Sequence, residues 1–132
     1  MTQDEILNEL QIIIAETRGV EEDEVVTGAN LFNDLGLESI DFLEISFRME
    51  ESFGFPFPTD DLGKLMSSVN ENSTKEDVEG VLDRLEGDFF IAVDRSKVEG
   101  VDPIDADKLR DSVLNLFTVG VLVNFVAKKQ AA

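Results

Sequence analysis

The sequence predicts a protein that is all-α or nearly so, because helical patterns follow one another along most of its 132 residues. Apolar residues in these stretches recur three and four positions apart, which is typical of amphipathic helices. Good N-terminal capping residues precede several of the stretches, and glycine or proline follows them.

The longest helices are expected in the first half of the chain. The first should begin after Thr2, in a capping box with Glu5, and end near Gly19. A second should run from about Ser39 to Phe53, and the glycine and prolines after it should end it, because proline lacks a backbone donor.

Between these helices, residues 20–37 are expected to form a long ordered loop. Such loops are often functional. Their apolar residues are spaced irregularly here, as anchors that hold a loop to a core would be: Val20, Val25, Val26, Leu31, Phe32 and Leu35.

Shorter elements are expected beyond residue 58. Thr59 can cap a short helix, and Thr74 can cap another that ends near Gly87. Residues 88–93 fit either a short strand or a tucked apolar loop. Helical spacing resumes at Asp105, and Thr118 is expected to cap a last helix.

The composition excludes several kinds of function. A net charge of −18 makes nucleic acid an unexpected partner and favours basic protein surfaces. The chain has no cysteine and no histidine, so it lacks the usual nucleophile–base pairs and metal ligands. We therefore expect no catalytic residue and no metal site.

The sequence also predicts where the protein works. Its amino terminus lacks the pattern of a signal peptide, and its longest apolar stretch, residues 119–127, is too short to span a bilayer. A cytoplasmic protein without a membrane span is expected. The strong like charge favours a monomer.

Residues 34–41, which read DLGLESID, are the most informative segment of the chain. They place Ser39 at a junction between a turn and a helix, with Gly36 three positions earlier. The segment resembles the attachment site of acyl carrier proteins (ACPs), and the likeness continues to Phe53. This resemblance implies that Ser39 carries 4′-phosphopantetheine derived from coenzyme A, with Gly36, Leu37 and Glu38 completing the site.

The resemblance covers residues 1–58 and about 106 to the end, and it implies the four-helix bundle of the family. The chain is then a single ACP-like domain, 1–132, with a mainly helical insertion at about 62–101. The insertion is similar to that of specialised ACPs, some of which serve acylation of lipid A with long chains. The family usually has aspartate before the serine, whereas Glu38 keeps the carboxylate one methylene further out.

A serine at a helix start suits this chemistry. Before modification its hydroxyl can cap free backbone donors, and afterwards its phosphodiester would lie at the positive end of the helix dipole. The structural alternative is that Ser39 is an ordinary N-cap.

The second helix is the expected docking surface. Between residues 34 and 61 there are eight acidic residues and one base, Arg48. In the family, partner enzymes present basic patches to this helix: phosphopantetheinyl transferase, acyl-ACP synthetase or fatty-acid synthase enzymes, and acyltransferases. A solvated acidic face is the alternative. The expected docking residues are Ile40, Asp41, Glu44, Phe47, Glu50 and Glu51.

Apolar side chains could enclose an acyl chain between the helices or form only a packed core. The candidates are Leu10, Ile14, Leu43, Ile45, Val113, Leu122 and Phe125.

The leading interpretation is a non-enzymatic carrier that presents thioesters to fatty-acid or lipid-acylating enzymes, with long chains for lipid A preferred. A carrier for polyketide or peptide-like products is the alternative within that class. An unmodified acidic adaptor between proteins is the alternative outside it, and a hydrolase is disfavoured.

Overall fold

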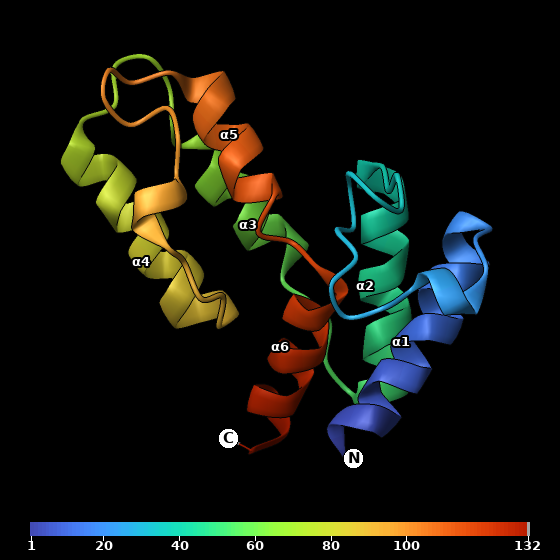
Figure 1. Ribbon diagram of the computed structural model, residues 1–132. Coiled ribbons are helices and arrows are strands. Elements are labelled where there is room, and N and C mark those ends of the chain that lie inside the picture. Colours follow the sequence, from blue (N-terminus) through green and yellow to red (C-terminus); the bar gives the residue numbers. More distant parts are fainter. Residues whose placement is uncertain (132) are drawn as a thin grey trace. The chain divides into compact units, whose positions relative to one another are not determined.

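The computed structural model describes residues 1–131, and within that range it is all-helical, as predicted. Six α-helices and two short 3₁₀ turns make up its regular structure (Figure 1). The β-type pairing described is limited to two isolated bridges. Across residues 1–131, none of the helices combines the length and the apolar character needed to cross a membrane.

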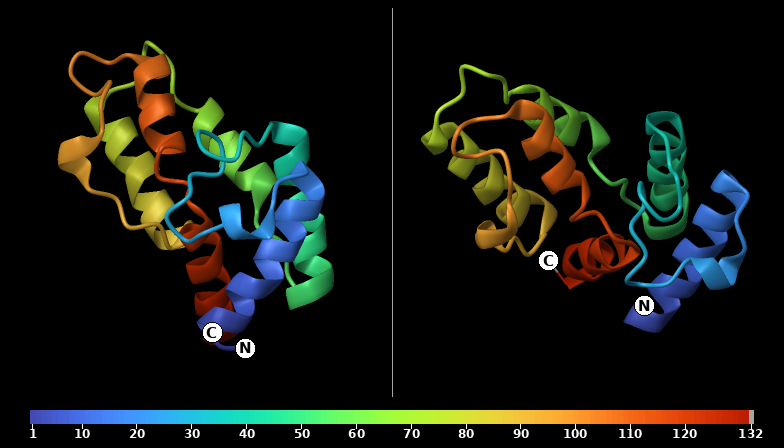
Figure 2. Two further views of the ribbon diagram at one scale, coloured as in Figure 1. Left: turned by 45° about the vertical axis from the view of Figure 1, so that its right-hand side comes forward. Right: turned by 45° about the horizontal axis from the view of Figure 1, so that its top comes forward.

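The chain divides into two compact units. The first unit consists of Met1–Thr59 together with Phe117–Ala132, and the second unit is Asp60–Leu116. The second unit thus includes more of the chain than residues 62–101, where the insertion is expected. Both views in Figure 2 show α3, α4 and α5 side by side within the second unit.

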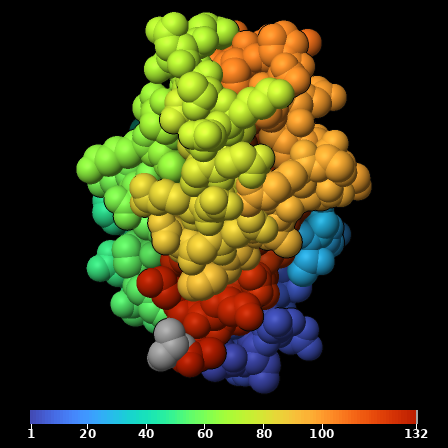
Figure 3. Space-filling model, turned by 90° about the vertical axis from the view of Figure 1, so that its left-hand side faces the viewer, coloured from blue at the N-terminus to red at the C-terminus, as the bar shows by residue number. Residues whose placement is uncertain are grey.

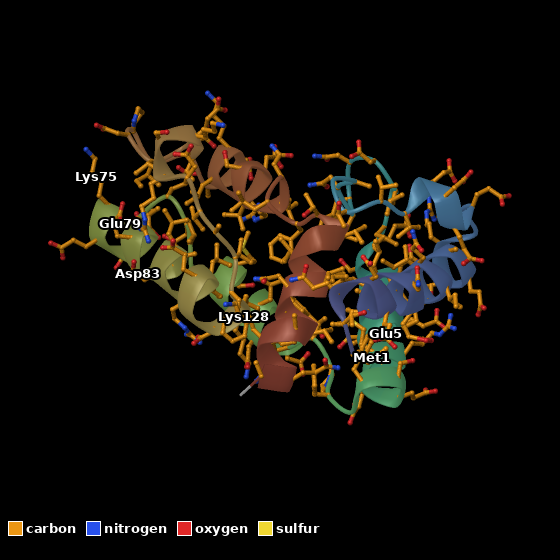
Figure 4. All side chains as sticks on the ribbon, turned by 60° about the horizontal axis from the view of Figure 1, so that its bottom comes forward. Met1, Glu5, Lys75, Glu79, Asp83 and Lys128 are labelled. Carbon is orange, nitrogen blue, oxygen red and sulfur yellow. The ribbon has the colours of Figure 1, made fainter. Side chains whose placement is uncertain are left out.

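The first unit contains three helices: α1 (Gln3–Arg18), α2 (Ser39–Phe53) and α6 (Val119–Ala131). Helix α1 packs against both of the others. The predicted capping box opens α1, because Thr2 Oγ1 accepts from Glu5 N at 3.2 Å and Thr2 N donates to Glu5 Oε1 at 2.8 Å. The hydrogen bond from the Thr2 backbone N–H to the Glu5 carboxylate is the main cause that lowers the pKa of Glu5, which lies in the first turn of α1 (Figure 4).

Both predicted glycine ends are confirmed. Gly19 closes α1 with φ 78°, and Gly54 closes α2 with φ 89°. This left-handed conformation suits glycine because a side chain would be strained there.

Aromatic rings occupy much of the core of the first unit. Phe42 on α2 meets Phe57 at 5.5 Å between ring centroids, and Phe57 meets Phe125 on α6 at 4.8 Å. Both pairs have the edge-to-face geometry that aromatic rings favour. The middle of α2 is also bonded to this core, since the buried Ser46 Oγ donates to Phe57 O at 2.6 Å.

The second unit contains α4 (Lys75–Phe89), α5 (Ala106–Leu114) and all of α3 (Thr59–Ser67) except its first residue. The cap at Thr74 is confirmed, because its side chain accepts from Asp77 N at 3.1 Å. The predicted end of α4 near Gly87 is wrong. The helix continues to Phe89, which is buried, and ends at Phe90 with φ 58°. The buried Phe89 side chain favours a further helical turn beyond Gly87. The glycine in the sequence does not indicate that a residue after it is buried.

Residues 88–93 form no strand. Phe89 belongs to α4, and Ile91 is a buried loop residue whose N–H donates to Leu85 O at 3.1 Å. The alternative of a tucked apolar loop is therefore the correct one beyond Phe90.

One cation joins the following loop to α4. Arg95 pairs with three carboxylates of α4, those of Glu79, Asp83 and Glu86, and its Nη2 lies 2.8 Å from Asp83 Oδ1. The hydrogen bond to Glu86 is the main cause that raises the pKa of Arg95. Figure 3 shows the loop after α4 lying beside that helix, and Figure 4 shows Glu79 and Asp83 projecting from it.

Candidate functional site

Ser39 is the first residue of α2, and its side chain is exposed. The prediction that Ser39 caps this helix is wrong, because Glu38 occupies the N-cap position. The Asp41 carboxylate accepts from Glu38 N at 2.9 Å, so Glu38 and Asp41 close the helix start. Among residues 1–131 no hydrogen bond to the Ser39 hydroxyl is found. The hydroxyl thus stands at the amino end of a helix without serving it as a cap.

The loop before Ser39 is ordered by Asn30, which is buried. Its side-chain oxygen accepts from Phe32 N at 3.0 Å and from Asn33 N at 2.9 Å. Its carbonyl accepts from Asp34 N and Leu35 N, each at 3.1 Å. No role of Asn30 was predicted from the sequence, although asparagine often stabilises turns in this way.

The same loop is joined to the start of α6. Leu31 N donates to Phe117 O at 2.9 Å, and Leu37 N donates to Leu31 O at 3.0 Å. The cap at Thr118 is confirmed, because its hydroxyl accepts from Val121 N at 3.3 Å. Backbone N–H groups of Val119 and Gly120 donate to loop carbonyls at 2.9 Å, which satisfies donors that a helix start leaves free.

The anchors proposed for this loop behave differently from one another. Val25, Leu31 and Leu35 are buried, as predicted, and Phe32 is half-buried. Val26 is exposed, which corrects its assignment as an anchor. Irregular spacing identifies a loop, but it does not reveal which of two adjacent valines faces the core.

Gly36 has a conformation that glycine favours, with φ 67°. It also lies against the end of α1, because a Cβ at this position would be 3.3 Å from Arg18 Nη2. The Arg18 Nε donates to Leu35 O at 3.3 Å, and its Nη1 is 3.8 Å from Asp41 Oδ2. Arg18 thus contacts residues on both sides of Ser39 along the chain, a role that was not predicted from the sequence.

An exposed surface runs along the outer side of α2. Ile40 is 72% exposed and Phe47 is 57% exposed. We name this surface the α2 face and define it by Ile40, Glu44, Phe47, Glu50 and Glu51, which are all exposed. Their spacing of three or four residues places them on one side of the helix.

Two side chains of α2 behave differently from the α2 face. Asp41, the remaining expected docking residue, is half-buried and engaged with Glu38 and Arg18. Arg48 turns toward α1, where its Nη2 lies 2.9 Å from Glu16 Oε2. The α2 face therefore carries acidic and apolar side chains without a basic residue among them.

Most residues named as acyl-chain lining are core residues. Leu10, Ile14, Ile45, Leu122 and Phe125 are fully or almost fully buried in the first unit. Leu43 is 42% exposed, so it does not belong with them, and Val113 is buried in the second unit. These buried side chains are therefore part of a packed core, which was one of the two alternatives predicted for them.

The family model for the phosphopantetheine attachment site matches residues 8–71, a segment that includes Ser39. An acyl carrier protein of Lactobacillus johnsonii is 37% identical over 67 residues, which are 51% of this chain and 84% of that protein. One of Guillardia theta is 37% identical over 71 residues, 54% of this chain and 86% of the relative. An acyl carrier protein of Cyanidium caldarium is 29% identical over 85 residues, which are 64% of this chain and 92% of that protein. No solved structure gives a significant match.

The chain belongs to the acyl carrier protein family. Members are non-catalytic carriers, and the cofactor is 4′-phosphopantetheine. These relatives are matched over most of their own length, whereas the alignments span 51% to 64% of this chain. A large part of the chain is therefore additional to what these ACPs share with it.

Proposed function

We propose that Ser39 is the residue to which 4′-phosphopantetheine is attached, with Gly36, Leu37 and Glu38 forming the turn that presents it. The observation that carries this proposal is an exposed serine hydroxyl, without a hydrogen bond among residues 1–131, on the first residue of α2. It lies within the segment that the family model matches.

The surroundings of Ser39 fit the attached group. Helix α2 has 15 residues, and its amino end favours a phosphodiester because free backbone donors and the helix dipole meet there. In the attachment, Ser39 Oγ forms a bond to the phosphorus that bears the pantetheine arm of coenzyme A. The pyrophosphate P–O bond breaks, adenosine 3′,5′-bisphosphate leaves, and the hydroxyl proton passes to a base of the transferase. The arm supplies the thiol that forms thioesters. The chain has no thiol of its own, because it contains no cysteine.

The α2 face is the proposed docking surface for the transferase and for acyl-handling enzymes. Exposed Ile40 and Phe47 offer apolar contacts, and the surrounding glutamates offer negative charge. Basic patches on partners would be drawn to this surface by electrostatic complementarity. Asp41 contributes by holding the helix start, because its carboxylate is already engaged there.

The proposed cargo is a fatty-acyl chain for lipid acylation, with long chains for lipid A as the specific pathway. The second unit supports a specialised role, since it has its own buried residues and extends a chain that its relatives match only in part. Intact-mass analysis of the protein isolated from its source would identify the acyl group. Long acyl chains support the proposal, and polyketide or aminoacyl intermediates would replace it with the alternative carrier function.

Attachment itself can be tested by intact mass after incubation with coenzyme A and a broad-specificity phosphopantetheinyl transferase. Wild type should gain one phosphopantetheine group, and Ser39→Ala should gain none. Ser52→Ala is the matched control, because Ser52 is an exposed serine on the same helix, and it should be modified like wild type. If folded wild type stays unmodified with several transferases, the unmodified adaptor becomes the leading function.

A further inference from the structure

We propose that Arg18 is a positioning residue for Ser39, which holds the attachment turn and the first turn of α2 in one arrangement. This inference rests on the proposed attachment at Ser39. It assigns a role to a residue of α1 that lies 21 positions before the serine in the chain.

The contacts of Arg18 lie on both sides of Ser39. Its Nε–H donates to the carbonyl of Leu35 at 3.3 Å, four residues before the serine. Its Nη1 lies 3.8 Å from the Asp41 carboxylate, two residues after the serine. That carboxylate also accepts from Glu38 N at 2.9 Å. A hydrogen bond to Leu35 and an ion pair to Asp41 therefore connect Arg18 to the turn and to the helix start.

The backbone of Arg18 is held in place by helix α1. Arg18 is the last residue of α1, and Gly19 ends that helix with a hydrogen bond from its N–H to Ala15 O at 2.8 Å. Helix α1 packs against α2 through a buried apolar face, so the arginine backbone cannot easily follow a moving loop. A rigid element supports a functional side chain better than a loop does.

The contact requires the shape of an arginine. Its guanidinium is planar and can donate in two directions at once, whereas a lysine ammonium is a compact point charge. The plane lies against Gly36, where a Cβ would be 3.3 Å from Arg18 Nη2. Glycine at 36 and arginine at 18 therefore form one close contact beneath the turn.

Arg18 also carries a positive charge. The effect of this charge on the transfer reaction must be separated from the effect of positioning Ser39. Arg18→Lys keeps the charge but loses the two-directional contact, and Arg18→Gln removes the charge. The matched control is Arg48→Gln. Arg48 is also a partly exposed arginine, and it joins α2 to α1 through Glu16 and the Ile13 carbonyl, away from the attachment turn.

The experiment measures steady-state transfer from coenzyme A to each full-length variant, well below its measured unfolding temperature. We expect kcat to fall about tenfold in both Arg18→Lys and Arg18→Gln, since a misplaced reacting group is costly even when binding persists. Arg48→Gln should keep the wild-type kcat. Amide hydrogen exchange at residues 35–41 should be faster in the Arg18 variants than in Arg48→Gln.

Other outcomes overturn the inference in identifiable ways. A wild-type kcat in Arg18→Lys, with only KM changed in Arg18→Gln, would show that the charge alone matters. Equal losses in Arg48→Gln would show a general effect on the contact between α1 and α2. Lack of modification of wild type would contradict attachment at Ser39 itself, so failure of the two proposals is distinguishable. If Arg18→Gln does not fold, Arg18→Lys still decides the question.

Discussion

Asn30 and Asp34 are joined in both directions at the base of the loop that leads to Ser39. The Asp34 carboxylate accepts from Asn30 N at 2.7 Å, and Asp34 N donates to Asn30 O at 3.1 Å. Because the Asn30 amide oxygen accepts two further backbone N–H groups, this pair organises the loop from within.

Replacement of Asn30 by alanine should destabilise the protein by about 1–3 kcal/mol, because part-buried backbone donors lose their acceptor. Denaturant unfolding followed by circular dichroism measures this loss. Asn70→Ala is the control, since Asn70 makes a similar turn contact to Asn72 N but is exposed, and water replaces it there. Equal losses in both variants would contradict this role of Asn30.

Two glycine-to-alanine changes should have opposite signs. Gly36→Ala should destabilise by about 1–2 kcal/mol, because φ is 67° and the new Cβ would press on Arg18. Gly80→Ala should stabilise by about 0.5–1 kcal/mol, because Gly80 lies inside α4 with open space around it. Denaturant unfolding measures both, and a stabilised Gly36→Ala would contradict the described turn.

Phe47→Ala should weaken docking without unfolding the protein. Phe47 is exposed, so unfolding free energy should change by less than about 0.5 kcal/mol. The KM for a transferase should rise about fivefold or more, as expected for an aromatic residue at an interface. Val26→Ala removes an exposed apolar side chain outside the α2 face and should leave KM unchanged. Equal KM values for all three proteins would exclude Phe47 from docking.

Arg95→Gln should loosen the loop after α4. Glu79, Asp83 and Glu86 would lose their shared cation, so their mutual repulsion should make the variant more sensitive to low salt than wild type. Hydrogen exchange at residues 90–98, measured at low and moderate salt, tests this. Arg84→Gln is the control, because Arg84 pairs within its own helix with Asp88. Matching salt responses in the two variants would argue against a role of Arg95 in holding this loop to α4.

The resemblance at residues 34–41 predicted the family correctly, because that segment joins a rare motif to a helix pattern. The attachment at Ser39, the docking residues and the cytoplasmic location stay predictions. The exposed positions on α2 could be anticipated from spacing, whereas the ion pair between Asp41 and Arg18 could not, since Arg18 comes from another helix.

The sequence by itself determined the all-helical class, the capping box at Thr2, the caps at Thr74 and Thr118, and the ends at Gly19 and Gly54. These features arise from contacts within a few residues, which a local pattern contains. The cap of α2 is also a local contact, because Glu38 and Asp41 form it in place of the serine that ordinarily would. Only the tertiary structure decided that α4 continues to Phe89 and that Arg18 lies against Gly36. In both cases, burial and side-chain reach across the fold compete with local preference.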